Sequence, residues 1–247
     1  MILESIFKKD YSKIFLFEEF SKCKINDLKD ILNAYNCMSP LEYILKKAFF
    51  YENYFYVDKN VLIPRAETEV LVEKAISLKP KTVLEVGTGS GCIILSILDK
   101  LKISKGFGLD LSKEALGIAI KNKNNLQISN CEFKISDLLE KIKTNSQFDL
   151  IIANLPYVPK GSYVGAKTYF SEPHLALFAN KNGLLLIEKL IIQLRDKKIK
   201  FKYLLLEFHY NHSQKITNLV KENFNKSKIE IFADYCGHQR FVLVEMP

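Results

Sequence analysis

The fold is decided by the stretch Thr82-Val83-Leu84-Glu85-Val86-Gly87-Thr88-Gly89-Ser90-Gly91-Cys92, which predicts a strand, a glycine-rich turn and the start of a helix. Residues 82–86 form a compact apolar run, short enough for a buried strand. The glycines after it let the backbone approach a ligand closely, and the helix that begins at Cys92 offers unpaired N–H groups at its N-terminus. The stretch therefore predicts a nucleotide-binding unit.

The residues around these glycines indicate which kind of nucleotide binds. No Lys-Ser or Lys-Thr pair follows them and their spacing is not G-x-G-x-x-G, so a phosphate-cradling P-loop is not indicated. Glu85 precedes the glycines, and the next two strands end at Asp110 and Asp137. Acids at successive strand ends suit a ligand with hydroxyls, an amine and a cationic centre, which describes S-adenosylmethionine better than a dinucleotide. The alternative is that Asp110 and Asp137 only cap helices.

Strands and helices alternate on both sides of this unit. Helices are predicted at 68–78, 92–98, 184–194 and 213–224. Strands are predicted at 82–86, 106–109, 132–135, 148–153, 203–208, 229–232 and 241–244. Alternation of this kind builds a parallel sheet, which the last two adjacent strands close. We therefore expect an α/β fold with a seven-stranded Rossmann-like sheet.

A second stretch, Ile151 to Pro159, is the predicted centre of the chemistry. It continues the strand at 148–153, and its two prolines exclude a helix or a further ladder. Asn154 then lies at a strand's carboxyl end, where ligands bind in open α/β sheets. Its side chain and the Leu155 carbonyl can accept both hydrogens of one NH2 group, while Tyr157 can stack on a planar amide or base. Such a holder orients a nitrogen nucleophile. A proline-rich turn without function is the alternative.

The remaining segments predict a domain on each side of a linker. Residues 1–47 carry apolar side chains at helical spacing and predict a small N-terminal helical domain, whose third segment begins near Leu41. Residues 48–65 show aromatic alternation and predict a β-hairpin linker, and residues 66–247 form the sheet domain. Residues 160–182 predict a long irregular loop, which at a strand's carboxyl end usually acts as a lid.

Composition excludes several classes of protein. No apolar run is long enough to span a membrane and no secretory signal begins the chain, so we expect a cytoplasmic protein without a membrane partner. The five cysteines include no C-x-x-C pair, and His209 and His212 have no third ligand nearby, so no disulfide framework and no metal are expected.

The formal charge of +8 is compatible with a polyanionic partner. However, only Arg65, Arg195 and Arg240 are arginines, and the other basic residues are lysines. Because nucleic-acid readers rely on arginine forks, we expect no direct nucleic-acid partner.

Several motifs occur together in the order seen in peptide chain release factor glutamine methyltransferases, a family of class I methyltransferases that this chain resembles. The segments that carry the resemblance are 40–44, 61–69, 85–92, 149–159, 172–177 and 234–240. Ordered motifs together are far more specific than one short motif. The resemblance implies methyl transfer from S-adenosylmethionine, with S-adenosylhomocysteine as product, to the side-chain amide of the glutamine in the Gly-Gly-Gln motif of release factors. Residues 1–47 would dock this partner, and we expect a monomer.

The resemblance also implies roles for individual residues. The expected cofactor-binding residues are Glu85, Gly87, Thr88, Gly89, Ser90, Gly91, Asp110, Asp137, Leu138 and Asn154. The glycine loop would surround the methionine part, Asp110 the ribose, and Asp137 with Leu138 the adenine. The expected catalytic residues are Asn154, Leu155, Pro156 and Tyr157, which also bind substrate together with Arg65 and Glu67.

Three departures from the family and three rival functions remain. Leu155 and Ala66 each replace a proline of the family, and the N-terminal region is shorter. Because the acceptor at Leu155 is a backbone carbonyl, leucine keeps the contact with some loss of loop rigidity. The loop 154–157 also resembles that of ribosomal RNA adenine dimethylases, so rRNA amino-group methylation is the alternative; Val158-Pro159 after it disfavours that reading. A DNA adenine methyltransferase would need a recognition domain, and the intact Asn154 disfavours a non-catalytic subunit.

Overall fold

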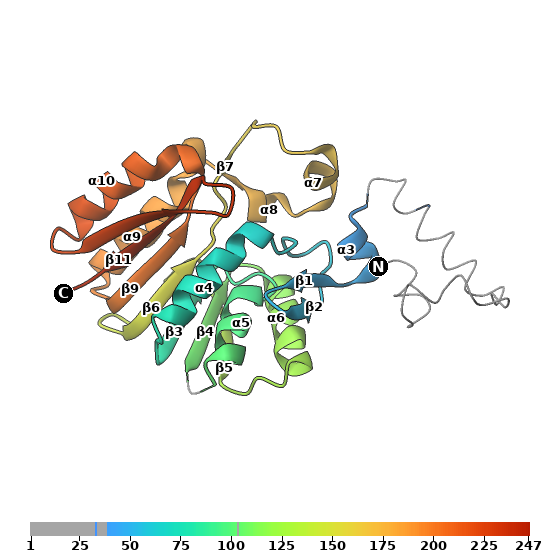
Figure 1. Ribbon diagram of the computed structural model, residues 1–247, viewed down its shortest axis with the longest axis horizontal. Coiled ribbons are helices and arrows are strands. Elements are labelled where there is room, and N and C mark those ends of the chain that lie inside the picture. The colour runs from blue at the N-terminus through green and yellow to red at the C-terminus, as the bar shows by residue number, and fades with distance from the viewer. Residues whose placement is uncertain (1–32, 34–38, 103) are drawn as a thin grey trace.

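The computed structural model describes residues 33, 39–102 and 104–247. Its centre is a seven-stranded sheet with the order β10-β11-β9-β6-β3-β4-β5 (Figure 1). Its strands are β3 Thr82–Val86, β4 Lys105–Asp110, β5 Cys131–Ile135, β6 Gln147–Ala153, β9 Lys200–Glu207, β10 Lys228–Ala233 and β11 Gln239–Glu245. Strand β11 pairs antiparallel with both β10 and β9, and the other strand pairs of this sheet are parallel. The predicted seven-stranded α/β sheet is confirmed.

Helices cover both faces of the sheet (Figure 1). They are α4 Glu69–Ser77, α5 Cys92–Lys100, α6 Lys113–Asn125, α9 Leu185–Asp196 and α10 Ser213–Asn223. Successive side chains of a strand point to opposite faces. Thus Val83 joins the core under α4 and α5, whereas Leu84 joins the core under α9 and α10. Both faces are buried, which explains why the strands read as continuous apolar runs.

The expected elements agree with the observed ones to within a few residues, but helix α6 was not predicted. Its apolar side chains are few, and one of its buried residues is polar, Asn122. The Asn122 side chain accepts from Tyr56 N at 2.7 Å and donates to the carbonyl oxygens of Tyr56 and Ser90. Because a polar residue fills this core position, the hydrophobic pattern of the helix is weak. The same contacts tie the glycine loop to the hairpin.

The N-terminal side of the described chain contains a short helix and a hairpin. Helix α3 Leu41–Leu45 is the expected third segment, and β1 Ala48–Phe50 pairs antiparallel with β2 Asn53–Phe55. Phe50 and Phe55 are fully buried against the sheet domain. The hairpin lies inside the range predicted for the linker. The predicted helices of residues 1–38 lie outside the described residues except for Asn33, so the division into domains remains a prediction.

The connection between β6 and α9 is more regular than the sequence indicated. It contains α7 Ala166–Ser171, α8 His174–Leu177 and η3 Lys181–Gly183, and β7 Val158–Pro159 pairs in parallel with β8 Phe178–Ala179. The predictions of an irregular loop and of no further ladder after the prolines are therefore wrong. A proline lacks only the N–H donor, and its carbonyl remains available to a short edge strand.

Three further expectations concern absences. Among the described residues, no helix is long and apolar enough to cross a membrane. Cys92, Cys131 and Cys236 are free. In the same part of the chain no group of three or more potential metal ligands comes together.

Candidate active site

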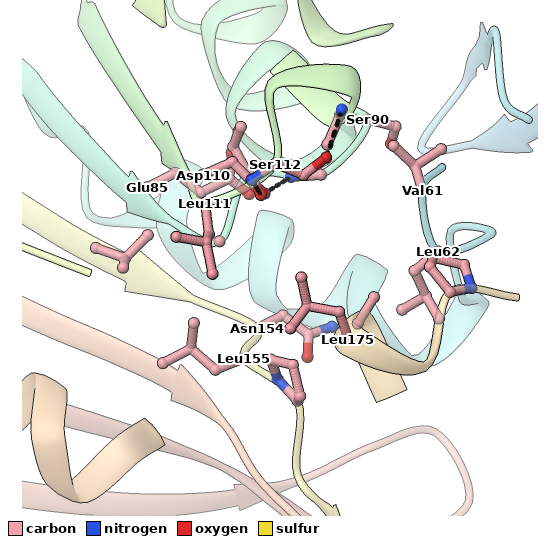
Figure 2. A pocket seen from close by; sticks show the side chains of 18 of the residues that line it. Val61, Leu62, Glu85, Ser90, Asp110, Leu111, Ser112, Asn154, Leu155 and Leu175 are labelled. Carbon is pink, nitrogen blue, oxygen red and sulfur yellow. Dashed lines mark hydrogen bonds between the residues drawn. The ribbon is translucent and has the colours of Figure 1, made fainter. Parts of the chain in front are cut away.

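A cavity of about 310 Å³ opens at the carboxyl ends of β3, β4 and β6 (Figure 2). Residues from the glycine loop, the turn after β4, the segment before α4 and the loop after β6 form its walls. The predicted site residues that line it are Arg65, Glu85, Gly87, Thr88, Gly89, Ser90, Asp110, Asp137, Leu138, Asn154, Leu155 and Pro156. The fold therefore gathers most of the predicted set around one cavity.

Three predicted residues do not line this cavity. Gly91 caps helix α5 with a φ of 80°, and a Cβ there would face Leu95 and Ala119. Glu67 is exposed on the short helix η2 Ala66–Thr68. Tyr157 points its hydroxyl to Glu207 instead. These residues support or flank the cavity in this structure.

Glu85 is a buried carboxylic acid in the wall of the cavity (Figure 2). One of its oxygens accepts a hydrogen bond from the Thr88 hydroxyl, while the other, Oε1, has no partner within the described part of the chain. Burial raises the pKa of Glu85 to about 8. An unpaired buried acceptor costs free energy, so this oxygen suits an ammonium or other cationic group of a ligand.

Asp110, at the end of β4, links the glycine loop to the start of α6. Its Oδ2 accepts from Gly89 N at 2.8 Å, and its Oδ1 accepts from Ser112 N at 2.9 Å. Burial raises the pKa of its carboxyl. A carboxylate has about four acceptor positions, so two remain for hydroxyl groups of a ligand.

The third wall follows β5. Leu138 is buried with a φ of 46°, and the Ser136 hydroxyl donates to its carbonyl oxygen at 2.8 Å. Asp137 is exposed, whereas Leu111 and Leu138 offer apolar surface to the cavity. This wall suits a flat, weakly polar ring with polar groups at its edge.

The loop after β6 is fixed by a row of hydrogen bonds. Asn154 Nδ2 donates to Thr68 Oγ1 at 3.1 Å, and the Thr68 hydroxyl donates to Glu207 Oε2 at 2.9 Å. The Tyr157 hydroxyl donates to the other Glu207 oxygen at 2.8 Å. Burial is the main cause that raises the pKa of Glu207 to about 7. Thr68 and Glu207 were not predicted as site residues.

Two packing contacts hold the same loop. Leu155 is buried in the core, and a Cβ placed on Gly87 would lie 2.9 Å from its Cδ2 atom. Leucine therefore anchors the loop by packing. Gly183 has a φ of 89°, and a Cβ there would lie 1.9 Å from the Tyr157 carbonyl oxygen. Only glycine permits this approach, and the turn signal Asn182-Gly183 was the available hint.

Arg65, a predicted substrate-binding residue, has a partner inside the protein. Its Nη2 atom lies 2.6 Å from Oε1 of the buried Glu172, whose other oxygen accepts from Ile63 N at 3.1 Å. Just beyond Glu172, Pro173, Leu175 and Ala176 line the cavity (Figure 2 labels Leu175). The pair thus joins the 160–182 segment to the segment before α4. Sequence reasoning included Glu172 in a motif but assigned it no role.

The chain matches the family described as "Methyltransferase domain" over residues 78–239. It is 35% identical over 225 residues to the release factor glutamine methyltransferase of Streptococcus pneumoniae, which covers 88% of this chain and 79% of the relative. It is 32% identical to that of Dictyoglomus turgidum, over 99% of this chain and 89% of the relative.

Solved structures show the same fold at low sequence identity. The hMettl16 catalytic domain in complex with MAT2A 3'UTR hairpin 6 superposes with a TM-score of 0.59 at 15% identity, over 78% of this chain and 74% of that one. An O-methyltransferase family protein from Burkholderia thailandensis gives a TM-score of 0.51 at 12% identity, over 73% and 56%.

The sheet order, the cavity at its carboxyl edge and the matching domain define a class I methyltransferase. Identities above 30% over most of both chains define the family more narrowly. The chain belongs to the release factor glutamine methyltransferase family. The predicted family, fold class and enzyme class are confirmed.

Proposed function

We propose that this enzyme transfers a methyl group from S-adenosylmethionine to the side-chain amide nitrogen of the glutamine in the Gly-Gly-Gln motif of peptide chain release factors. The names of its relatives support this substrate. The single observation that carries the proposal is the position of Asn154 and Leu155 in the cavity wall, at the end of β6. Nothing in the structure favours the rRNA alternative.

The cavity residues fit S-adenosylmethionine, which supplies an activated methyl group on a sulfonium centre when bound. Glu85 Oε1, buried without a partner among the described residues, would accept from the ammonium group of the methionine part. Asp110, with two acceptor positions left, would hold the ribose hydroxyls. Leu138 and Asp137 would contact the adenine ring and its amine. The glycine loop would face the methionine part.

The substrate amide would be held by two acceptors. Asn154 Oδ1 and the Leu155 carbonyl oxygen would each accept one hydrogen of the glutamine NH2 group. Holding both hydrogens turns the nitrogen lone pair out of conjugation and toward the methyl group. Pro156 restricts the loop, and Tyr157 supports it through Glu207. The nitrogen would bond to the methyl group as the sulfur–methyl bond breaks, S-adenosylhomocysteine would leave, and the nitrogen would then lose one proton to water. No general base is needed before the attack, so orientation is the main task of these residues.

We further propose that residues 1–47 dock the release factor, that residues 48–65 link them to the catalytic domain of residues 66–247, and that the enzyme acts as a monomer. Hydrogen exchange of the full chain with and without a release factor tests the docking role. Protection within residues 1–47 on binding is expected. Protection confined to residues 66–247 would contradict this division of labour.

The proposed substrate is tested by methyl incorporation from labelled S-adenosylmethionine. Three acceptors are compared: the release factor of the same organism, a copy whose motif glutamine is changed to alanine, and ribosomal RNA. Label in the unmodified factor alone is expected. Label in ribosomal RNA would establish the alternative instead, and equal label in both copies of the factor would place the methyl group on another residue.

A further inference from the structure

A buried carboxylate connects the catalytic loop, residues 154–157, to parts of the chain that are far from it in sequence. Glu207 ends β9 and is buried, as is Thr68 at the end of η2. Thr68 and Glu207 are 139 residues apart, Thr68 and Asn154 are 86 apart, and Tyr157 and Glu207 are 50 apart. Three elements of the chain therefore meet at one carboxyl group beside the cavity.

The hydrogen bonds from Asn154 to Thr68 and from Thr68 to Glu207 can run in only one direction. An ionised carboxylate can only accept, so the hydroxyls of Thr68 and Tyr157 must both donate to Glu207. A threonine hydroxyl has a single hydrogen. Because Thr68 gives it to Glu207, its oxygen can only accept from Asn154, and it accepts from Nδ2. The NH2 group of the Asn154 amide therefore faces Thr68.

This direction decides what Asn154 can offer to a substrate. With its NH2 group held by Thr68, its oxygen Oδ1 receives no hydrogen bond from any residue that the structure describes. Without Glu207, Thr68 could donate to Oδ1, and the amide could turn by half a rotation. Its NH2 group would then oppose the NH2 group of the substrate glutamine, which is a contact between two donors.

We propose that Glu207 and Thr68 are positioning residues, which fix the Asn154 side-chain amide with its oxygen free to accept from the substrate amide. The inference deepens the proposed function and rests on it, because a donor NH2 group on the substrate is what requires an acceptor at Asn154. The Tyr157 hydroxyl donates a hydrogen bond to the second oxygen of Glu207, so both oxygens of the carboxylate accept hydrogen bonds.

The surroundings of Glu207 make the row sensitive to pH. Burial is the largest cause and raises the pKa of Glu207 to about 7. The hydrogen bonds from Tyr157 and Thr68 lower this pKa, as does Arg240 from β11, while Glu67 from η2 raises it. When pH falls through this value, the protonated carboxyl has a hydrogen of its own to donate, and the direction of the row is lost. Activity should therefore fall on the acid side.

The variants that test the proposal keep the shape of the side chain nearly unchanged and alter its hydrogen-bonding groups. Thr68→Val is nearly isosteric and lacks the hydroxyl, whereas Thr68→Ser restores it. Glu207→Gln keeps the shape of the side chain but adds a donor. Thr82→Val is the matched control, because the Thr82 hydroxyl also pairs with a carboxylate, Asp149, at the opposite edge of the sheet.

Steady-state methylation of a release factor is measured for each variant, with the melting temperature and the Kd for S-adenosylmethionine. We expect Thr68→Val and Glu207→Gln to lower kcat about tenfold or more with little change in Kd, since one lost orienting group acts mainly in the transition state. Thr68→Ser should recover most of the activity, and Thr82→Val should retain it. The kcat of the wild-type enzyme should decrease as pH drops below about 7, whereas the kcat of Glu207→Gln should not decrease in this range.

A wild-type kcat retained by a folded Thr68→Val variant would overturn the positioning role while leaving the proposed function intact. Absence of methylation by the wild-type enzyme would instead remove the proposed function. The amide orientation is then tested directly by NMR of protein with labelled asparagine, the Asn154 signal being assigned with Asn154→Asp. Slow exchange of the Asn154 NH2 hydrogens that becomes fast in Thr68→Val is expected, and equally fast exchange in both proteins would refute the inference.

Discussion

The two halves of the cavity are built in different ways. The half that would hold the cofactor consists of strand ends and the turns directly after them, and its main contacts join Asp110 to the backbone of Gly89 and Ser112. The half that would hold the substrate depends on hydrogen bonds between distant parts of the chain. Examples are the Thr68 hydroxyl with Glu207 and the backbone N–H of Ile63 with Glu172, which are 109 residues apart. Local sequence specifies the first half, whereas only the complete fold assembles the second.

Removal of the Asn154 amide should give the largest effect and separate the two halves most clearly. Asn154→Ala is expected to lower kcat by about 10²- to 10³-fold, because it removes one acceptor for the substrate NH2 group. The Kd for S-adenosylmethionine should change only a few-fold, since Asp110 and Glu85 remain. Isothermal titration and initial rates measure the two quantities. Asn223→Ala on α10 is the control, and a matching loss in both quantities would show that the halves are not separable.

A change at Asp110 should affect cofactor binding and leave kcat nearly unchanged, which is the opposite of the effect expected for Asn154→Ala. Asp110→Asn should raise the Kd for S-adenosylmethionine by roughly tenfold, because hydrogen bonds to a charged acceptor are about twice as strong as neutral ones. At saturating cofactor, kcat should stay within a few-fold of the wild-type value. Cofactor titration followed by rates at saturation checks both parts. An unchanged Kd would mean that Asp110 serves only the turn before α6.

Gly183 tests whether the substrate half needs close backbone packing. In Gly183→Ala the added methyl group would collide with the Tyr157 carbonyl, so kcat should fall and unfolding should be easier by about 1–3 kcal/mol. Gly161→Ala is the matched control, since its φ of 87° is equally strained but nothing lies within 4 Å of the added Cβ. Denaturation and rates compare the two. An equal loss of kcat in both variants would rule out a specific role for the contact with Tyr157.

The smallest expected effect is the release of protons from Glu85 when S-adenosylmethionine binds. Its raised pKa of about 8 means that it is mostly protonated at pH 7 in the folded protein, and that stability falls as pH rises from its ordinary value of 4.5 toward 8. A bound ammonium group favours the ionised form, so binding of S-adenosylmethionine at pH 7 should release a fraction of a proton. Calorimetry in buffers with different ionisation enthalpies measures it. Proton release by Glu85→Gln equal to that of the wild type would assign the effect to another group.

The contrast between the halves also explains what the sequence could predict. Glu85, the glycines and Asp110 lie at strand ends that apolar runs mark, so their convergence follows from the fold class. Asn154 was found because its loop carries two prolines and an aromatic residue. Nothing local marks Glu207, which simply ends a buried strand, or shows that it meets Thr68.

Two further features have physical reasons of the same kind. Helix α6 was overlooked because Asn122 occupies a core position where the hydrophobic pattern needs an apolar residue. The pairing of Arg65 with Glu172 was not predicted, because only the folded 160–182 segment brings this partner near. Whether Arg65 and Glu67 also contact the substrate remains a prediction.

The measurement that tests the central claim most directly is mass spectrometry of the release-factor peptide that contains the Gly-Gly-Gln motif, after incubation with S-adenosylmethionine and enzyme. Fragmentation locates the added group. One methyl group on the motif glutamine with the wild-type enzyme, and almost none with Asn154→Ala, is the predicted result. A methyl group on another residue, or equal methylation by both enzymes, would contradict the account.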